Sequence, residues 1–270
     1  MLARIEPGML RGTIAAPPSK SMTHRMLICA ALAAGDSTVR PIELSEDILA
    51  TSDDLRALGA EIRQEEDILH VTGCDPADAG SAVIPCRESG STLRFLLPLC
   101  LLNGKEMTLT GSERLLSRPL DVYEMLCRER GFRLERTPEG IRVQGKLEPG
   151  EYTVRGDLSS QFLTGLLYAL SLLPGESILR VLPPIESEPY LRMTLEAMAE
   201  SGVFIGRPET ETLRIPAERV TWPGKRPWKA TGATPLSLRP CGRRGTTSGL
   251  RDSGRTARRE TRCAGIISAG

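Results

Sequence analysis

Two basic side chains stand at the start of an expected helix, in the stretch "APPSKSMTHR" (16–25). The two prolines end any preceding helix, and Ser19 is a favourable residue to begin a new one. Lys20 and Arg25 then fall in its first turns, where the positive end of the helix dipole disfavours cations by about 0.3–1 kcal/mol. We therefore expect an anion, such as a phosphate or a carboxylate, to bind beside these two side chains.

Serine-rich helix starts occur three times, at Ser19, Ser89 and Ser159, at intervals of 70 residues. A single such serine needs no ligand to explain it, because a serine cap stabilises a helix by about 1 kcal/mol. Three equivalent starts, two of them accompanied by basic residues, favour a shared anion-binding site instead. The free N–H groups and positive potential of helix N-termini suit phosphate and carboxylate.

A repeated unit must position these helix starts. Its clearest marker is a glycine that follows a helix, at Gly59, Gly131 and Gly202, where a left-handed cap is usual. Each unit reads strand, helix, strand, helix, strand, strand. In the second unit we predict these elements at 82–85, 90–102, 106–110, 118–130, 132–135 and 141–144, and in the third at 151–155, 159–172, 177–182, 189–200, 203–206 and 211–214.

The first helix of each unit is apolar on almost every side, as in "MLICAALAA", "LRFLLPLCLL" and "FLTGLLYALSLL". Helices of that kind are buried all round. The second helices, such as "DVYEMLCRER", are amphipathic and belong on the outside. The predicted fold class is therefore α/β, a pseudo-threefold domain whose three buried helices point their N-termini to one common face.

Composition limits the kinds of function that the chain can have. The seven cysteines are scattered without a Cys-x-x-Cys pair, and His24 lies far from His70, so we expect no metal site. The beginning, "MLARIEPGML", does not resemble a signal peptide, and no apolar run is long enough to span a bilayer. These features predict a cytoplasmic protein with reduced, mostly buried thiols.

Residues 230–270 differ in composition from the rest of the chain, with eight arginines, two acidic residues and only five large apolar residues. Such a segment buries too little apolar surface to offset its ordering entropy, so we predict that it is disordered. Its composition resembles a GC-rich gene read out of frame, and our hypothesis is a frameshift a few residues before Trp228, which the DNA sequence can test. The alternative, a basic arm for nucleic acid, is disfavoured because the segment has no aromatic residue.

Five motifs, in order along the chain, carry a family resemblance: "PPSKSMTHR", "ESGSTLRFLLPL", "LLSRPL", "GDLSSQFLTGLLYAL" and "ESEPYLRMT". Together they resemble the 3-phosphoshikimate 1-carboxyvinyltransferase family, also called 5-enolpyruvylshikimate-3-phosphate synthases. The resemblance implies two similar domains, each made of three βαβαββ units around buried helices, with the active site in the cleft. It divides this chain into a strand of the second domain (1–18), an enolpyruvyl transferase domain of three repeats (19–225) and an aberrant basic tail (226–270), with the second domain largely missing.

The resemblance also implies binding roles for individual residues. Shikimate 3-phosphate would be held by Lys20, Ser21, Arg25, Ser159, Ser160, Gln161, Ser187 and Tyr190. Phosphoenolpyruvate would be held by Lys20, Gly90, Arg94, Arg118 and Gln161. A structural role for Arg94 stays open.

By the same resemblance, the reaction adds the 5-hydroxyl of shikimate 3-phosphate to C2 of phosphoenolpyruvate and then expels phosphate, in aromatic amino-acid biosynthesis. No metal or organic cofactor is implied. The family's acid–base residues lie in its second domain, so we assign no catalytic residue and expect this chain to bind its ligands without turnover. The expected partners are the two small-molecule substrates. We expect the protein itself to be a monomer that binds neither nucleic acid nor membrane.

Two other functions stay open at this point. A UDP-N-acetylglucosamine 1-carboxyvinyltransferase resembles this fold, although the Ser-Lys-Ser-x3-Arg and Ser-Ser-Gln motifs argue against it. A non-catalytic anion-binding domain is the second alternative. Calorimetry with the two kinds of substrate separates the enzymes from each other, and a turnover assay separates either from a binding domain.

Overall fold

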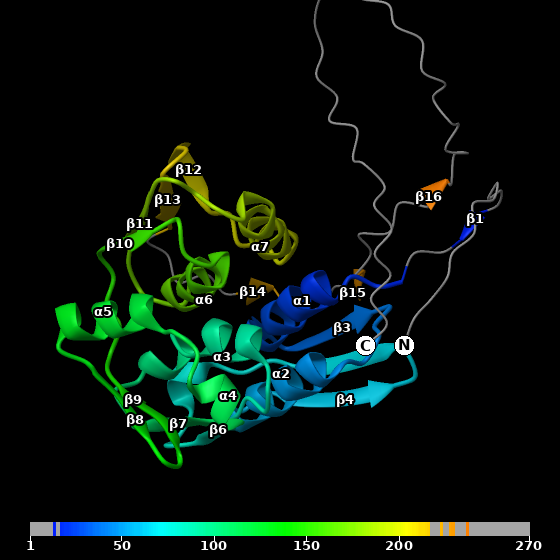
Figure 1. The fold of residues 1–270 in the computed structure, drawn as a ribbon. Helices are drawn as coiled ribbons and strands as arrows, with labels where there is room; N and C mark the ends of the chain where they lie inside the picture. The colour runs from blue at the N-terminus through cyan, green and yellow to red at the C-terminus, as the bar shows by residue number, and fades with distance from the viewer. Residues whose placement is uncertain (1–12, 15–16, 217–221, 224–226, 230–235, 238–270) are drawn as a thin grey trace, which may run out of the picture. The chain divides into compact units, whose positions relative to one another are not determined.

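Three four-stranded sheets with the same internal arrangement form the framework of the protein (Figure 1). The computed structural model describes residues 13–14, 17–216, 222–223, 227–229 and 236–237. The chain divides into a large unit, Ile14–Leu236, and a second unit of Met1–Thr13 with Ser237–Gly270. The three sheets belong to the large unit.

The second and third repeats each form one sheet. The second sheet contains β6 (Val83–Pro85), β7 (Met107–Thr110), β8 (Arg133–Thr137) and β9 (Gly140–Gln144). The third contains β10 (Glu151–Arg155), β11 (Ser177–Leu182), β12 (Gly206–Glu209) and β13 (Thr212–Ile215). In both, the first strand runs parallel to the second, and the last strand lies antiparallel between the second and third. The shared order, β6-β7-β9-β8 and β10-β11-β13-β12, confirms the predicted repeat.

The first sheet is completed by a strand from much later in the chain. Its order is β15 (Pro227–Lys229), β3 (Asp36–Arg40), β5 (Ile68–Thr72) and β4 (Glu61–Glu65). β15 runs parallel to β3 and takes the edge position that β6 and β10 hold in the other two sheets.

β15 lies within residues 226–270, the segment that the sequence analysis assigns to an aberrant basic tail. Pairing with the edge of β3 uses backbone groups, so it needs no apolar side chains from this segment. Apart from β15 and β16 (Leu236–Ser237), the tail lies outside the described residues. The division into 1–18, 19–225 and 226–270 stays a prediction.

The first helix of each repeat lies in the core, as its apolar character predicts. These helices are α1 (Lys20–Leu32), α3 (Gly90–Leu96) and α6 (Ser160–Leu170). All residues of α1 but three, and all of α6 but one, are buried. The amphipathic helices α2 (Glu46–Ala57), α5 (Asp121–Arg130) and α7 (Glu188–Glu200) have both buried and exposed residues. No helix in the described part of the chain is long and apolar enough to cross a membrane.

The remaining elements are short. They are η1 (Pro76–Asp78), η2 (Leu99–Leu101), α4 (Glu113–Leu116), β1 (Thr13–Ile14), β2 (Ala33–Ala34) and β14 (Trp222–Pro223), of which β14 and β2 pair in parallel.

Pro98 divides the helix predicted at 90–102 into α3 and η2. Proline has no N–H, so the α-helical hydrogen bond to the carbonyl of Arg94 cannot form. The hydroxyl of Tyr123, from α5, donates to that carbonyl at 2.5 Å and lies 3.2 Å from the carbonyl of Phe162. Tyr123 is completely buried and thereby joins α3, α5 and α6.

Some predicted boundaries shift for local reasons. The helix predicted at 118–130 begins at Asp121, because a residue that precedes a proline, here Arg118 before Pro119, disfavours helical backbone angles. The third repeat's last two strands lie at 206–209 and 212–215 instead of 203–206 and 211–214. The repeat glycines do have the positive φ expected after a helix, at 112°, 69° and 83° along the chain.

Candidate functional site

The three predicted serine caps form, and side chains connect the helices that they begin. Ser19 accepts a hydrogen bond from Met22 N, Ser89 from Thr92 N and Ser159 from Gln161 N. Arg25 of α1 contacts Thr194 of α7, which contacts Thr164 of α6. Arg94 of α3 contacts Gln161 of α6. The helices that carry the predicted binding residues therefore form one connected network.

Arg25 is a buried cation that has no acidic partner among the residues that the structure describes. Only 2% of it is exposed. Its guanidinium donates to the hydroxyl of Thr194 (Nε, 2.8 Å) and to the carbonyls of Ser21 (Nη1, 2.8 Å) and Tyr190 (Nη2, 3.2 Å). Burial lowers the pKa of Arg25, and no carboxylate of the described residues forms an ion pair with it. A buried charge is costly unless an opposite charge compensates it, so this arrangement favours an anionic ligand.

Lys20 is paired with a carboxylate of the protein. It forms an ion pair with Asp47, at the start of α2, while 55% of the Lys20 side chain remains exposed. Burial acts to raise the pKa of the Asp47 carboxyl, but hydrogen bonds with Lys20 and Ser89 outweigh it and the pKa is lowered. The protein thus supplies part of the negative charge that sequence analysis assigned to a ligand alone.

Arg94 and Arg118 form a second positively charged region. Arg94 donates from Nη1 to Oε1 of Gln161 at 2.8 Å, and its Nη2 lies 3.3 Å from the carbonyl of Pro119. Burial, and then repulsion from Arg118, lower the pKa of Arg94. Gly90 lies so close to Arg118 that a Cβ there would be 2.3 Å from Nη1. Two neighbouring guanidinium groups suit an anion with several oxygens, such as phosphate.

The other predicted binding residues lie at the starts of α6 and α7. Ser160 is the first residue of α6 and is 4% exposed. Ser187 precedes α7 with a φ of 59°, a conformation that only the surrounding structure can impose on a serine. Tyr190 is 49% exposed, and its ring centre lies 5.9 Å from Cζ of Arg25. The structure thus places the Tyr190 ring beside Arg25. The Ser187 side chain makes no capping hydrogen bond among the described residues.

Sequence reasoning missed a buried polar cluster at the starts of α1, α2 and α3. Nε2 of His24 lies 3.1 Å from the carbonyl of Asp47 and 2.5 Å from Oγ1 of Thr51, which lies 2.8 Å from Oγ1 of Thr92. Burial lowers the pKa of His24 to about 4, so its ring is neutral near pH 7. A signal was available, because polar residues within an otherwise apolar helix indicate buried hydrogen bonds. The cluster helps to position Asp47 beside Lys20.

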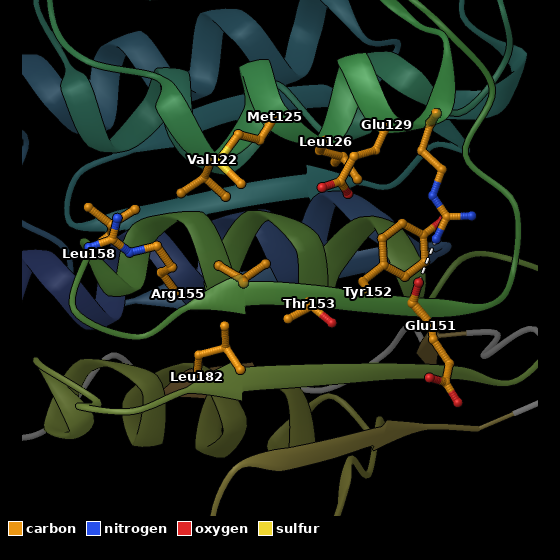
Figure 2. A pocket seen from close by; sticks show the side chains of 12 residues that line it. Val122, Met125, Leu126, Glu129, Glu151, Tyr152, Thr153, Arg155, Leu158 and Leu182 are labelled. Carbon is orange, nitrogen blue, oxygen red and sulfur yellow. Dashed lines mark hydrogen bonds between the residues drawn. The ribbon is translucent and has the colours of Figure 1, made fainter.

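A groove of about 290 Å³ between α5 and β10 contains none of these residues (Figure 2). Its apolar lining includes Val122, Met125, Leu126, Leu158 and Leu182. We assign the groove no part in the site. Over the described ranges, no three potential metal-ligating side chains come together.

Comparison with known proteins places the chain in a family. A family model described as EPSP synthase (3-phosphoshikimate 1-carboxyvinyltransferase) matches residues 5–224. The chain belongs to the EPSP synthase family. It is similar to the 3-phosphoshikimate 1-carboxyvinyltransferases of Clostridium kluyveri, 40% identical over 203 residues, and of Clostridium botulinum, 42% identical over 210 residues. These matches cover 74% and 75% of this chain and 48% of each relative, so the chain spans about half the length of the curated relatives it matches.

A solved structure supports the same fold. An EPSP synthase from Acinetobacter baumannii matches with a TM-score of 0.66 and 22% identity, over 81% of this chain and 50% of the other. At that identity the likeness shows the fold alone, and it confirms the predicted α/β architecture. The roles given above to single residues stay predictions within the EPSP synthase family.

Proposed function

We propose that the protein is a 3-phosphoshikimate 1-carboxyvinyltransferase and that the described residues bind its two substrates. In this reaction the 5-hydroxyl oxygen of shikimate 3-phosphate forms a bond to C2 of phosphoenolpyruvate, and the bond from C2 to the phosphate oxygen then breaks. Both substrates carry a phosphate and a carboxylate group. The observation that carries the proposal is Arg25, a buried cation that no carboxylate of the described residues compensates.

Arg25 and its neighbours hold shikimate 3-phosphate. Described residues accept hydrogen bonds from three of the five guanidinium N–H groups of Arg25, which leaves one N–H on each terminal nitrogen for a ligand oxygen. Lys20 and Ser21 begin the same helix, while Ser159 and Ser160 present the N-terminus of α6, whose N–H groups favour anions. Gln161, Ser187 and Tyr190 complete this set.

Phosphoenolpyruvate is held by the second positively charged region, together with Lys20. Arg118 is exposed and donates directly to the ligand, and Gly90 leaves room for its guanidinium. Arg94 adds charge and also orients the Gln161 amide through its 2.8 Å hydrogen bond. Preorganised donors of this kind stabilise charge that develops in a transition state.

These roles are binding and electrostatic, and no catalytic acid or base is assigned. The proposal includes a monomer that works in the cytoplasm and does not bind nucleic acid. Neither the UDP-sugar enzyme nor a non-catalytic anion-binding domain is favoured by the comparisons, since the matching family model is that of EPSP synthase.

The test is calorimetric titration of the 270-residue chain with shikimate 3-phosphate and, separately, with UDP-N-acetylglucosamine. We expect only the former to bind, and Arg25→Ala to weaken binding by about 1.5–3 kcal/mol, the scale of a hydrogen bond to a charged group. Arg142→Ala is the control, because it removes a half-buried arginine on β9 that is paired only with Glu139 among the described residues. Binding of the UDP-sugar alone, or full affinity in Arg25→Ala, would contradict the proposal. Phosphate release from phosphoenolpyruvate separates an active enzyme from a binding domain.

A further inference from the structure

Thr194 lies in a closed ring of hydrogen bonds that holds Arg25. Its hydroxyl oxygen accepts from Nε of Arg25 at 2.8 Å and lies 3.1 Å from the carbonyl of Tyr190. That carbonyl also accepts from Nη2 of Arg25, at 3.2 Å. On the other side, the hydroxyl of Thr164, from α6, lies 2.8 Å from that of Thr194. Thr164 and Thr194 are completely buried, so water does not compete for these contacts.

Only one placement of the protons satisfies every contact in this ring. The guanidinium of Arg25 can only donate, and the carbonyl of Tyr190 can only accept. The single proton of Thr194 therefore points to Tyr190, its oxygen accepts from Arg25, and Thr164 donates to the remaining lone pair. The hydroxyl of Thr194 is thus a committed acceptor for Nε of Arg25.

We propose that Thr194 is a positioning residue for Arg25. Nε and Nη2 lie on the same side of the guanidinium of Arg25. Their acceptors are the Thr194 hydroxyl and the Tyr190 carbonyl, and because these two are hydrogen-bonded to each other, they fix the plane of the guanidinium. The two N–H groups of Arg25 that no described residue accepts are thereby held in place before any ligand binds, which reduces the ordering that binding requires. This inference rests on the proposed function, in which Arg25 binds shikimate 3-phosphate.

The ring also joins distant parts of the chain. Thr164 follows the start of α6 by one helical turn, Thr194 belongs to α7, and Arg25 belongs to α1. Positioning by Thr194 therefore keeps Arg25 in a defined place relative to Ser160, another predicted ligand of the same substrate.

The first experiment concerns the free protein and measures hydrogen exchange of the Arg25 Nε–H by NMR in the full chain. Thr194→Val removes the hydroxyl and keeps the side-chain shape, and we expect exchange to become about tenfold faster, as the loss of one hydrogen bond allows. Thr194→Ser keeps the oxygen and should restore slow exchange. Thr23→Val is the matched control, because the Thr23 hydroxyl is equally buried on α1 and has no hydrogen-bond partner among the described residues.

Exchange that is unchanged in Thr194→Val, or equally fast in Thr23→Val, would overturn the proposal. If Thr194→Val does not fold, Thr194→Cys gives the same comparison, because a thiol fits the space but is a weaker acceptor.

The second experiment measures affinity for shikimate 3-phosphate in the same variants. Thr194→Val should bind about tenfold more weakly than the wild-type chain. In an Arg25→Lys background the same substitution should have no further effect, since Thr194 acts through Nε of Arg25. A further loss in that background would show a general structural effect and contradict the inference. If the wild-type chain does not bind shikimate 3-phosphate, the proposed function fails, while the exchange comparison still decides whether Thr194 positions Arg25.

Discussion

Neutralising Asp54 should remove a loss of folding stability that occurs as the pH rises. Asp54 lies on α2, is completely buried and forms no ion pair with a basic residue in the described part of the chain. Burial raises the pKa of its carboxyl from 3.8 to about 7, and the nearby Cys86 thiol opposes this only in part. The folded protein therefore binds this proton more tightly than the unfolded chain does. The stability linked to it is complete below about pH 4 and is lost as the pH rises through 7.

The size of the effect follows from the two pKa values. Relative to low pH, ionisation of Asp54 removes roughly 1.5 kcal/mol of unfolding free energy at pH 5 and roughly 4 kcal/mol at pH 8.5. The side chain in Asp54→Asn cannot ionise, so this variant does not lose stability in this way as the pH rises. The stability of the variant relative to the wild-type chain should therefore improve by roughly 2.5 kcal/mol between pH 5 and pH 8.5.

The assay is urea unfolding of both proteins at the two pH values. Glu61→Gln, which neutralises an exposed carboxylate on β4, is the control and should follow the wild-type pH dependence. If Asp54→Asn and the wild-type chain lose stability in parallel as the pH rises, Asp54 is already ionised in the folded protein and the reasoning fails.

Three further substitutions test other parts of the structure. Gly90→Ala places a methyl group against the Arg118 guanidinium, so affinity for phosphoenolpyruvate in the presence of shikimate 3-phosphate should fall by about 1.5–3 kcal/mol; unchanged affinity in calorimetry would remove this contact from the site. Tyr123→Phe leaves the carbonyl of Arg94 without its donor and should lower the unfolding free energy by about 1–3 kcal/mol in urea, whereas a near-neutral result would speak against that role of the hydroxyl. The pKa of buried His24 is lowered to about 4, so the stability contributed by the neutral ring is present above pH 6.5 and is lost as the pH falls. His24→Gln should therefore lose roughly 3 kcal/mol less unfolding free energy than the wild-type chain when the pH is lowered to 4. An equal loss in the two proteins would refute the burial argument.

Much of the fold could be predicted because its signals are local. The glycines at 59, 131 and 202 mark helix ends wherever they occur, and an apolar helix such as α6 must be buried in any fold. The outer strand of the first sheet could not be predicted in the same way. β15 has no apolar pattern, and it is a strand because the edge of β3, far away in sequence, offers it backbone partners.

In the candidate site, too, the features that depend on local sequence could be predicted, and those that depend on tertiary contacts could not. Lys20, Arg25 and the serine caps could be predicted to bind an anion from their types and their places at helix starts. Their partners could not, since the Lys20–Asp47 pair and the Arg94–Gln161 contact cross between helices. A propensity or a motif describes neighbours along the chain, whereas these contacts depend on how helices pack.

The sequence by itself thus determined the repeat, the buried helices and the helix caps, and it predicted which cations bind an anion. These follow from hydrophobic periodicity, capping chemistry and charge, which act over a few residues. Only the tertiary structure decided which cation is buried, which is paired with a carboxylate and which is oriented by another side chain. Arg25 and Thr194 are 169 residues apart, and their 2.8 Å contact exists because the packing of α1, α6 and α7 excludes water from the guanidinium and leaves the threonine oxygen as its acceptor.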